Sequence, residues 1–190
     1  MNKLIASLLL LGIANFSIAQ SSYFPIKKGS IMTYAYSKEL YQGQNFDVSQ
    51  LKMTVTISTE TKNIDGMEYF ISTTSTGGLS PNFTSYFRID SDGAIWAISE
   101  EGKQESIMMN KNPKVGDTWT TSKGSFKSTS KVIDLSGSIT TPTGSYSDCM
   151  VVESTENGAT SKAYFHPGTG MVAVAVSMGG SDKLFVYLTE

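Results

Sequence analysis

The chain has 190 residues, of which 15 are basic and 17 are acidic, so its formal net charge is −2. These charges are scattered, and the lack of a basic stripe argues against binding to nucleic acid. The single cysteine, Cys149, excludes an intrachain disulfide and a cysteine-based zinc site. A chain of this length can bury a sufficient core without such cross-links, and it suits a single domain.

The N-terminal segment predicts secretion. Lys3 gives a positive start, residues 4–13 form an apolar run, and Ser17 and Ala19 place small side chains at a cleavage site. The run is shorter than the roughly 20 apolar residues of a membrane-spanning helix, so we expect a signal peptide over residues 1–19 that is cleaved before Gln20. A lipoprotein would need a cysteine directly after the cut. The expected product, residues 20–190, is therefore a soluble protein of the periplasm or the cell exterior; an uncleaved anchoring helix is the alternative.

The remaining sequence predicts β-structure almost throughout. Residues 51–58 alternate apolar and polar side chains, which is typical of a strand with one buried face. After a turn at Asp65-Gly66, residues 67–74 form the next expected strand. Residues 86–89 and 94–98 predict a hairpin around Asp92-Gly93, and residues 151–154 and 160–165 predict another around Asn157-Gly158.

The last part of the chain adds two further strands. Residues 171–178 are apolar on both faces, so we expect them to lie centrally in the sheet, and residues 183–188 form the final strand. The full pattern of about ten to twelve short strands separated by turns predicts an all-β fold. We expect one domain with an antiparallel twisted sheet, arranged as an incomplete barrel or a sandwich.

Two motifs occur twice in the same order. Residues 28–33 match residues 115–120 around Gly29 and Gly116, and residues 86–88 match residues 164–166. Two copies of one β meander, about residues 20–105 and 106–190, would explain both matches as a pair of similar halves. Chance similarity between segments rich in glycine, threonine and aromatic residues is the alternative.

The sequence offers little chemistry for catalysis. Nucleophilic catalysis of the Ser-His-Asp or Cys-His type would have to use His166, the only histidine. Its place before Pro167 in a glycine-rich turn favours an exposed turn residue. Cys149 lies in a strand-like segment beside Asp148, which favours a buried, unreactive thiol. We therefore expect no catalytic residues and no cofactor, with a hydrolase that uses His166 or a carboxylate pair as the alternative. The adjacent Glu100-Glu101 is interpreted as a pair of solvated loop charges, and the sequence selects no particular pair.

A metal site is not expected either. Asp90 and Asp92 resemble the start of a calcium-binding loop, but Gly93 stands at the fourth position of that loop and not at the sixth. A hairpin turn explains this segment better, because Asp-Gly is a common pair at the end of a strand.

The aromatic residues provide the strongest candidate site. Alternation places Tyr34 and Tyr36 on one face of a strand, and the chain also contains Trp96, Trp119 and nine methionines. The favoured interpretation is packing in the core. The functional alternative is a partly open sheet whose aromatic and methionine-rich face binds an apolar ligand. The candidate ligand-binding residues are Tyr34, Tyr36, Trp96 and Trp119.

Three short segments resemble a known family. They are Tyr23-Phe24-Pro25-Ile26-Lys27-Lys28-Gly29, residues 141–149, and Tyr164-Phe165 followed by Gly168-Thr169-Gly170-Met171-Val172. In these segments the chain resembles the TapB-like family of small secreted or lipid-anchored β proteins of bacterial envelopes, most of which have unknown function. The resemblance implies a twisted antiparallel sheet and brings no catalytic residues.

These observations predict a secreted, soluble, non-enzymatic envelope protein that binds an apolar ligand or another envelope protein. Its expected partners include no nucleic acid and, after signal cleavage, no membrane anchor. Besides the hydrolase, a structural assembly subunit is an alternative, and it would need an exposed edge strand that can pair with a neighbour.

Overall fold

The computed structural model describes residues 22–41, 47–78, 81–98, 105–123, 126–156 and 158–190. The expected signal peptide, its cleavage site before Gln20 and the Glu100-Glu101 pair lie outside these residues. The described chain forms twelve strands: β1 (Ile31–Tyr36), β2 (Lys52–Ile64), β3 (Met67–Ser75), β4 (Phe83–Ile89), β5 (Ile95–Ile98), β6 (Ser106–Met109), β7 (Thr118–Lys123), β8 (Phe126–Thr141), β9 (Gly144–Glu156), β10 (Ala159–His166), β11 (Gly170–Met178) and β12 (Ser181–Leu188). Two short 3-10 helices, η1 (Lys38–Tyr41) and η2 (Val48–Gln50), lie between β1 and β2.

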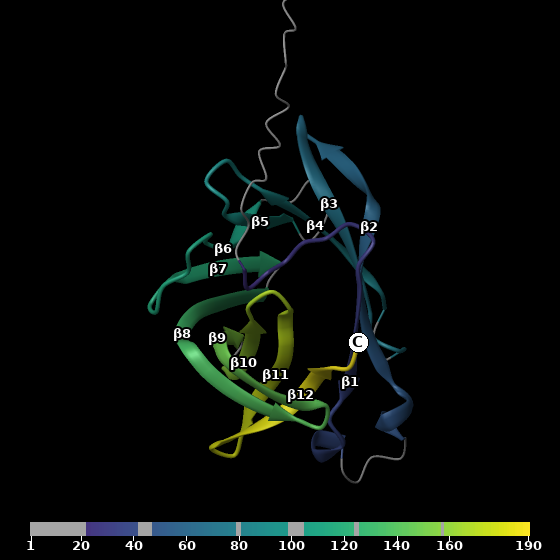
Figure 1. Ribbon diagram of the computed structural model, residues 1–190, viewed down its shortest axis with the longest axis vertical. Helices are drawn as coiled ribbons and strands as arrows, with labels where there is room; N and C mark the ends of the chain where they lie inside the picture. Colours follow the sequence, from purple (N-terminus) through teal and green to yellow (C-terminus); the bar gives the residue numbers. More distant parts are fainter. Residues whose placement is uncertain (1–21, 42–46, 79–80, 99–104, 124–125, 157) are drawn as a thin grey trace, which may run out of the picture.

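The strands form one antiparallel sheet that is nearly closed into a barrel (Figure 1). The sheet order runs from β6 back to β1, continues across the β1–β12 pair, and then runs from β12 back to β7. The two ends of the order, β6 and β7, approach each other, although no strand pairing joins them in the described residues. The predicted all-β antiparallel fold is confirmed, and the incomplete barrel is the correct one of the two expected arrangements.

The predicted strand patterns agree with the observed burial. In β2, Ile57 is buried and Lys52 is exposed, as the alternation of the sequence predicts. Strand β11 pairs with both β10 and β12, and its adjacent residues Val172 and Ala173 are both fully buried. Because neighbouring side chains of a strand point to opposite faces, β11 is covered on both sides, as expected from its apolar sequence.

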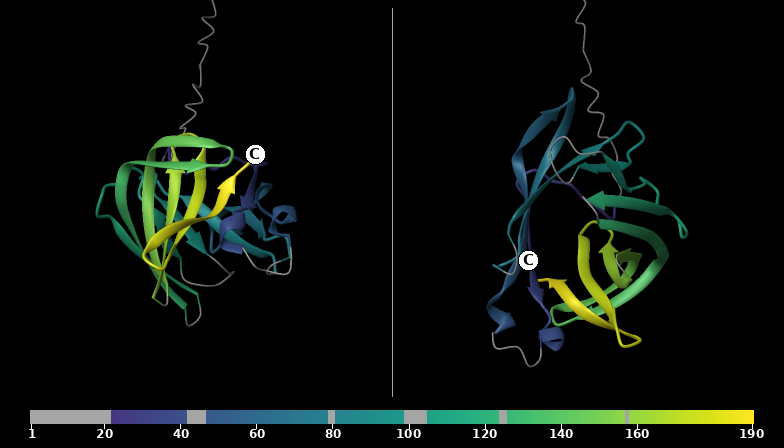
Figure 2. Two further views of the ribbon diagram at one scale, coloured as in Figure 1. Left: turned by 90° about the horizontal axis from the view of Figure 1, so that it is seen from below. Right: turned by 180° about the vertical axis from the view of Figure 1, so that it is seen from behind.

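The segment before β1 crosses the barrel (Figures 1 and 2). We call residues 22–30 the N-terminal strap. At one end, the Gly168 amide in the β10–β11 turn donates a hydrogen bond to the Ser22 carbonyl, at 2.7 Å. At the other end, the Gly29 amide donates to the Ile57 carbonyl of β2, at 2.9 Å. The strap therefore connects the two sides of the barrel, and its Ile26 side chain is buried in the main core.

The two expected halves have corresponding hydrogen bonds at their starts. Before β1, the Gly29 amide donates to Ile57 and the Ile57 amide donates to Ser30; before β7, the Gly116 amide donates to Val132 and the Val132 amide donates to Asp117. Both glycines have positive φ angles, +76° and +99°, which side chains rarely adopt. The correspondence relates the start of β1 to the start of β7. The bounds of the two halves stay a prediction. A common origin of the halves stays a prediction.

Candidate functional site

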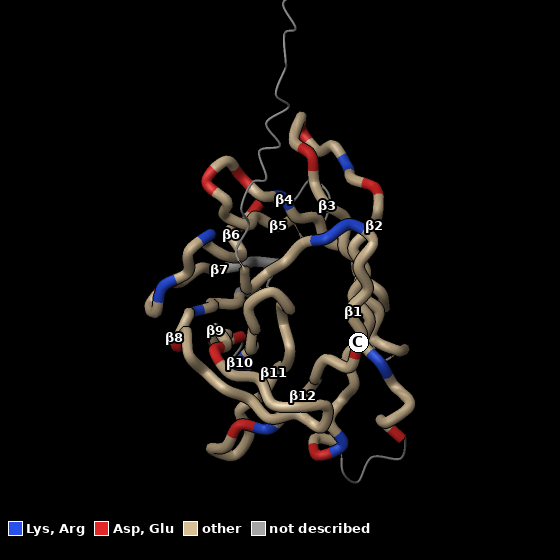
Figure 3. The backbone as a smooth tube through the Cα atoms, in the orientation of Figure 1, with Lys and Arg blue, Asp and Glu red and all other residues tan. Residues whose placement is uncertain are grey.

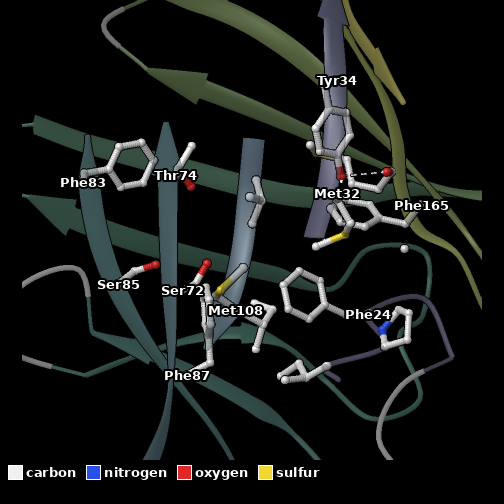
Figure 4. Close-up of a pocket in the computed structure, with 16 residues that line it drawn as sticks. Phe24, Met32, Tyr34, Ser72, Thr74, Phe83, Ser85, Phe87, Met108 and Phe165 are labelled. Atoms are coloured by element: carbon white, nitrogen blue, oxygen red, sulfur yellow. Dashed lines mark hydrogen bonds between the residues drawn. The ribbon is translucent and has the colours of Figure 1, made fainter. Parts of the chain in front are cut away.

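A cavity of about 230 Å³ lies inside the barrel between the strap, strands β1 to β4, and the start of β11 (Figure 4). Most of its wall is apolar, and Met32, Tyr34, Phe87 and Phe165 are among its largest side chains. The full lining consists of Phe24, Pro25, Ile26, Met32, Tyr34, Val55, Ile57, Ser72, Thr74, Phe83, Ser85, Phe87, Met108, Phe165, Gly170 and Met171. This apolar, concave space is the candidate functional site.

The strap forms one side of the cavity. The Phe24 ring lies edge-on to Phe87 of β4, with ring centroids 5.8 Å apart, and at a tilt to Phe165 of β10, with centroids 6.3 Å apart. Aromatic pairs of this kind stabilise a structure by about 0.5–1.5 kcal/mol beyond the burial of their area. Pro25 packs so close to Gly170 that a Cβ atom at that glycine would touch the proline ring at 3.4 Å. Phe24 and Pro25 thus close the cavity between the two halves of the barrel.

The opposite wall carries the polar groups of the cavity. Ser72 and Thr74 of β3 and Ser85 of β4 line it, and Ser72 stands directly opposite Ser85 in the β3–β4 register. Figure 4 shows the three hydroxyl groups on neighbouring strands, across the cavity from Phe24 and Phe165. The exposed Phe83, 45% accessible, lies at the end of this wall. The cavity therefore has an aromatic side and a side that bears hydroxyl groups.

Tyr34 is the one predicted site residue that lines the cavity. It is only 1% exposed, and its hydroxyl donates a hydrogen bond to the Met171 carbonyl of β11 at 3.0 Å. Burial raises the pKa of this hydroxyl well above its usual value, because the charged phenolate would lose its hydration. The group is a neutral structural contact across the barrel.

Tyr36 lies away from the cavity. It packs edge-on against Tyr41 and Phe185, with ring centroids 6.1 and 5.7 Å away, and its hydroxyl donates to the Thr76 carbonyl at 3.3 Å. It shares a face with Tyr34 as predicted, and both residues belong to one core cluster together with Val186.

The two tryptophans also lie outside the cavity lining. The Trp96 indole donates to the Asp90 carboxylate at 2.7 Å, and the Arg88 guanidinium lies 5.5 Å from its ring centroid. Trp119 of β7 packs against the main core. From the sequence alone, Phe24, Phe165 and the cavity hydroxyls were not identified as site residues. Phe24 and Phe165 lie in segments that resemble the TapB-like family, but the resemblance assigns them no role.

The Asp90–Gly93 segment forms the predicted hairpin turn. The Asp90 carboxylate accepts the amides of Asp92 and Ala94, at 3.0 and 2.9 Å, and Gly93 has a φ angle of +82°. Burial alone would raise the pKa of Asp90, but the hydrogen bonds from Trp96 and from the backbone lower it. Among the described residues, no group of three or more His, Cys, Asp or Glu side chains is placed to hold a metal ion.

His166 ends β10 and is half-buried, not exposed as the sequence predicted, because the Tyr146 ring packs edge-on against it with centroids 5.7 Å apart. Its Nδ1 atom lies 3.0 Å from the Thr169 hydroxyl. A hydrolytic triad also needs a carboxylate that orients the imidazole, and none hydrogen-bonds this ring in the described part of the chain.

Cys149 is fully buried in β9, as predicted. Burial and, secondly, the neighbouring Asp148 carboxylate raise the pKa of its thiol. A protonated, inaccessible thiol is a poor nucleophile, so this residue serves the core.

Charge is spread thinly around the barrel. Figure 3 shows acidic and basic residues of the described chain scattered over its connections and strand ends. The side chains that line the cavity carry no ionisable group except the buried Tyr34 hydroxyl. In the part of the chain that the structure describes, none of the helices has the length and the hydropathy that a membrane span requires.

Comparison with known proteins supports the fold alone. No protein-family model matches the chain, and no curated protein matches it. The chain is similar to a solved structure from Bacteroides fragilis described as a "putative exported protein with YmcC-like fold", with a TM-score of 0.51 and 11% identity. The alignment covers 87% of this chain and 96% of that one. The likeness supports a shared barrel-like architecture, while the TapB-like resemblance is more specific and stays a prediction.

Proposed function

We propose that this protein is a secreted, non-enzymatic binding protein that holds a small apolar ligand inside its barrel. The cavity between the strap and the β3–β4 wall is the observation that supports this proposal. Its walls are apolar over most of their surface, and the few polar groups in it converge on one side. Pockets for small molecules commonly have this composition.

The volume limits the size of the ligand. A cavity of roughly 150 Å³ can hold benzene, and pockets for drug-sized ligands begin near roughly 300 Å³. The value of about 230 Å³ lies between these limits. It suits one small apolar molecule, or one apolar arm of a larger one, and is too small for a complete membrane lipid.

The pattern of a secretory signal and the places of His166 and Cys149 also support the proposal. The first 19 residues have the pattern of a cleaved signal, and the structural neighbour from Bacteroides fragilis is described as exported. His166 lies outside the cavity lining, and Cys149 is sealed in the core. The hydrolase is therefore the weaker candidate. The assembly subunit is also weaker, because the unpaired edges of β6 and β7 approach each other.

The test is a titration of the folded protein, residues 20–190, with the neutral fluorescent probe N-phenyl-1-naphthylamine. We expect a saturable rise in fluorescence. Ser85→Leu places an apolar side chain in the cavity and should weaken binding about tenfold or more. Thr84→Leu is the matched control. Thr84 is the neighbour of Ser85 in β4, so its exposed side chain points to the opposite face of the sheet, away from the cavity.

Two results would contradict the proposal. If the folded wild-type protein gives no saturable signal, the cavity does not bind apolar molecules. If both leucine variants bind the probe equally well, the probe occupies another place on the protein. Circular dichroism spectra of the three proteins show whether each variant keeps the β fold.

A further inference from the structure

The hydroxyl-bearing wall of the cavity has an unusual environment. Ser72 and Thr74 are only 2% and 8% exposed, so both residues are more than nine-tenths buried. Neither hydroxyl hydrogen-bonds a side chain or a backbone group among the described residues. Buried polar groups normally have partners, because leaving one unpaired costs about 1–3 kcal/mol.

These hydroxyls open onto the cavity. No polar side-chain atom of the described residues is both sealed from solvent and without a partner. The Ser72 and Thr74 hydroxyls have no partner among the described residues, so they must be accessible, and the cavity is the space that their side chains line. Ser85 stands opposite Ser72 in the register and adds a third hydroxyl to the same wall.

The charge of the cavity restricts what these groups can bind. Its lining includes no Lys, Arg, His, Asp or Glu side chain. A buried carboxylate or ammonium group would find no opposite charge there, and transfer of an unpaired charge from water to such a site is strongly unfavourable. A hydroxyl can both donate and accept a hydrogen bond, so the three hydroxyls suit a neutral polar group.

From this geometry we infer that the ligand is an uncharged apolar molecule with a single hydroxyl or carbonyl group, which Ser72 and Thr74 bind with the help of Ser85. The aromatic side of the cavity, with Phe24 and Phe165, holds the apolar body of the ligand. This inference rests on the proposed function and makes it specific. It names the chemical class of the ligand and the end of the cavity that its polar group occupies.

Three compounds with the same ring system separate the possibilities: naphthalene, 2-naphthol and 2-naphthoate. Their affinities can be measured at pH 7 by displacement of N-phenyl-1-naphthylamine. We expect 2-naphthol to bind about fivefold more tightly than naphthalene, which corresponds to roughly one net hydrogen bond. The 2-naphthoate anion should bind at least about tenfold more weakly than 2-naphthol, because its charge has no partner in the cavity.

The double variant Ser72→Ala/Thr74→Val removes both buried hydroxyls with little change in volume. It should lose the preference for 2-naphthol and keep its affinity for naphthalene. Thr73→Val is the matched control, because Thr73 lies between the two residues and points to the opposite face. If the double variant does not fold, the single variant Ser85→Ala tests the same wall with a smaller expected loss.

The outcomes distinguish this inference from the proposed function. If naphthalene and 2-naphthol bind wild-type protein equally well, or if 2-naphthoate binds best, the assignment of the polar wall is wrong while the apolar cavity stands. If the preference for 2-naphthol survives in the double variant, the hydroxyls do not cause it and the inference also fails. If the probe itself does not bind, the proposed function fails. If the probe binds but none of the three compounds displaces it, the cavity stands and the assignment of the ligand class fails.

Discussion

Replacement of Tyr34 by phenylalanine tests how the two halves of the barrel are held together beside the cavity. The Tyr34 hydroxyl on β1 reaches past β12 to the Met171 carbonyl on β11, at 3.0 Å. The side chain is 1% exposed, so water cannot readily replace the lost hydroxyl. The substitution keeps the ring and removes the hydrogen bond between strands that are not neighbours in the sheet, together with a weaker contact of the same hydroxyl with the Met32 Sδ atom at 3.7 Å.

The expected cost follows from this burial. A typical hydrogen bond contributes about 0.5–1.5 kcal/mol net, and a buried group left without its partner raises the loss further. We therefore expect Tyr34→Phe to lower the free energy of unfolding by about 1–2 kcal/mol. In a protein of this size, each kcal/mol corresponds to roughly 2–4 °C in Tm.

Urea denaturation followed by circular dichroism measures this loss, and Tyr36→Phe provides the control. Tyr36 lies two residues further on the same face of β1, and its hydroxyl donates to the Thr76 carbonyl at the longer distance of 3.3 Å. Hydrogen bonds between oxygens are usually shorter, about 2.7–2.8 Å, so its removal should cost about 0.5 kcal/mol or less. Equal losses in the two variants, or no loss in Tyr34→Phe, would refute the role assigned to the Tyr34 hydroxyl.

Three further predictions concern pH, an ion pair and a tight contact. The pKa of Tyr34 is raised in the folded state. The stability that its neutral hydroxyl provides is therefore complete below the unfolded-state pKa of about 10 and is lost as the pH rises above it. Urea denaturation between pH 9 and about pH 11 should show a smaller loss of unfolding free energy with rising pH in Tyr34→Phe than in wild type. Glu105→Gln should lower the free energy of unfolding, measured by urea denaturation, by about 2 kcal/mol, because the Glu105 carboxylate accepts the Arg88 Nε–H at 2.6 Å and both side chains are 19% exposed. Binding of the fluorescent probe should be unchanged, since neither residue lines the cavity. Gly137→Ala should lower the free energy of unfolding, measured by urea denaturation, by about 2 kcal/mol, because the new Cβ atom would overlap Val151 Cγ2. If that overlap is the cause, Gly137→Ala should have little effect when it is made in the Val151→Ala variant.

Much of the β-structure could be predicted because its signals are local. The alternation in β2 and the Asp-Gly turn after β4 depend on residues that are close in sequence, and the structure has both. Local patterns could not predict the length of β8, which runs from Phe126 to Thr141 and has three register shifts against β9. Such irregularities arise from curvature, since a strand that wraps around a barrel bends at its bulges.

The candidate site was predicted less well than the fold. Tyr34 and Tyr36 do share a face and a core cluster, but only Tyr34 lines the cavity. The Tyr36 ring packs instead against Tyr41 and Phe185. The role of Trp96 had a local signal: its partner Asp90 is only six residues away and caps the same hairpin. The sequence alone gave no reason to select Ser72, which lies in a strand rich in serine and threonine.

The sequence by itself determined the strands, their turns, the buried thiol of Cys149 and the pattern of a secretory signal, because each depends on composition or on neighbours along the chain. Only the tertiary structure decided that β1 pairs with β12, that the strap crosses the barrel, and that Phe24 faces the hydroxyls of β3 and β4. These contacts join residues far apart in sequence, and closure of the sheet sets their positions. The cavity exists where two curved halves meet without filling the space between them, which no single strand pattern records.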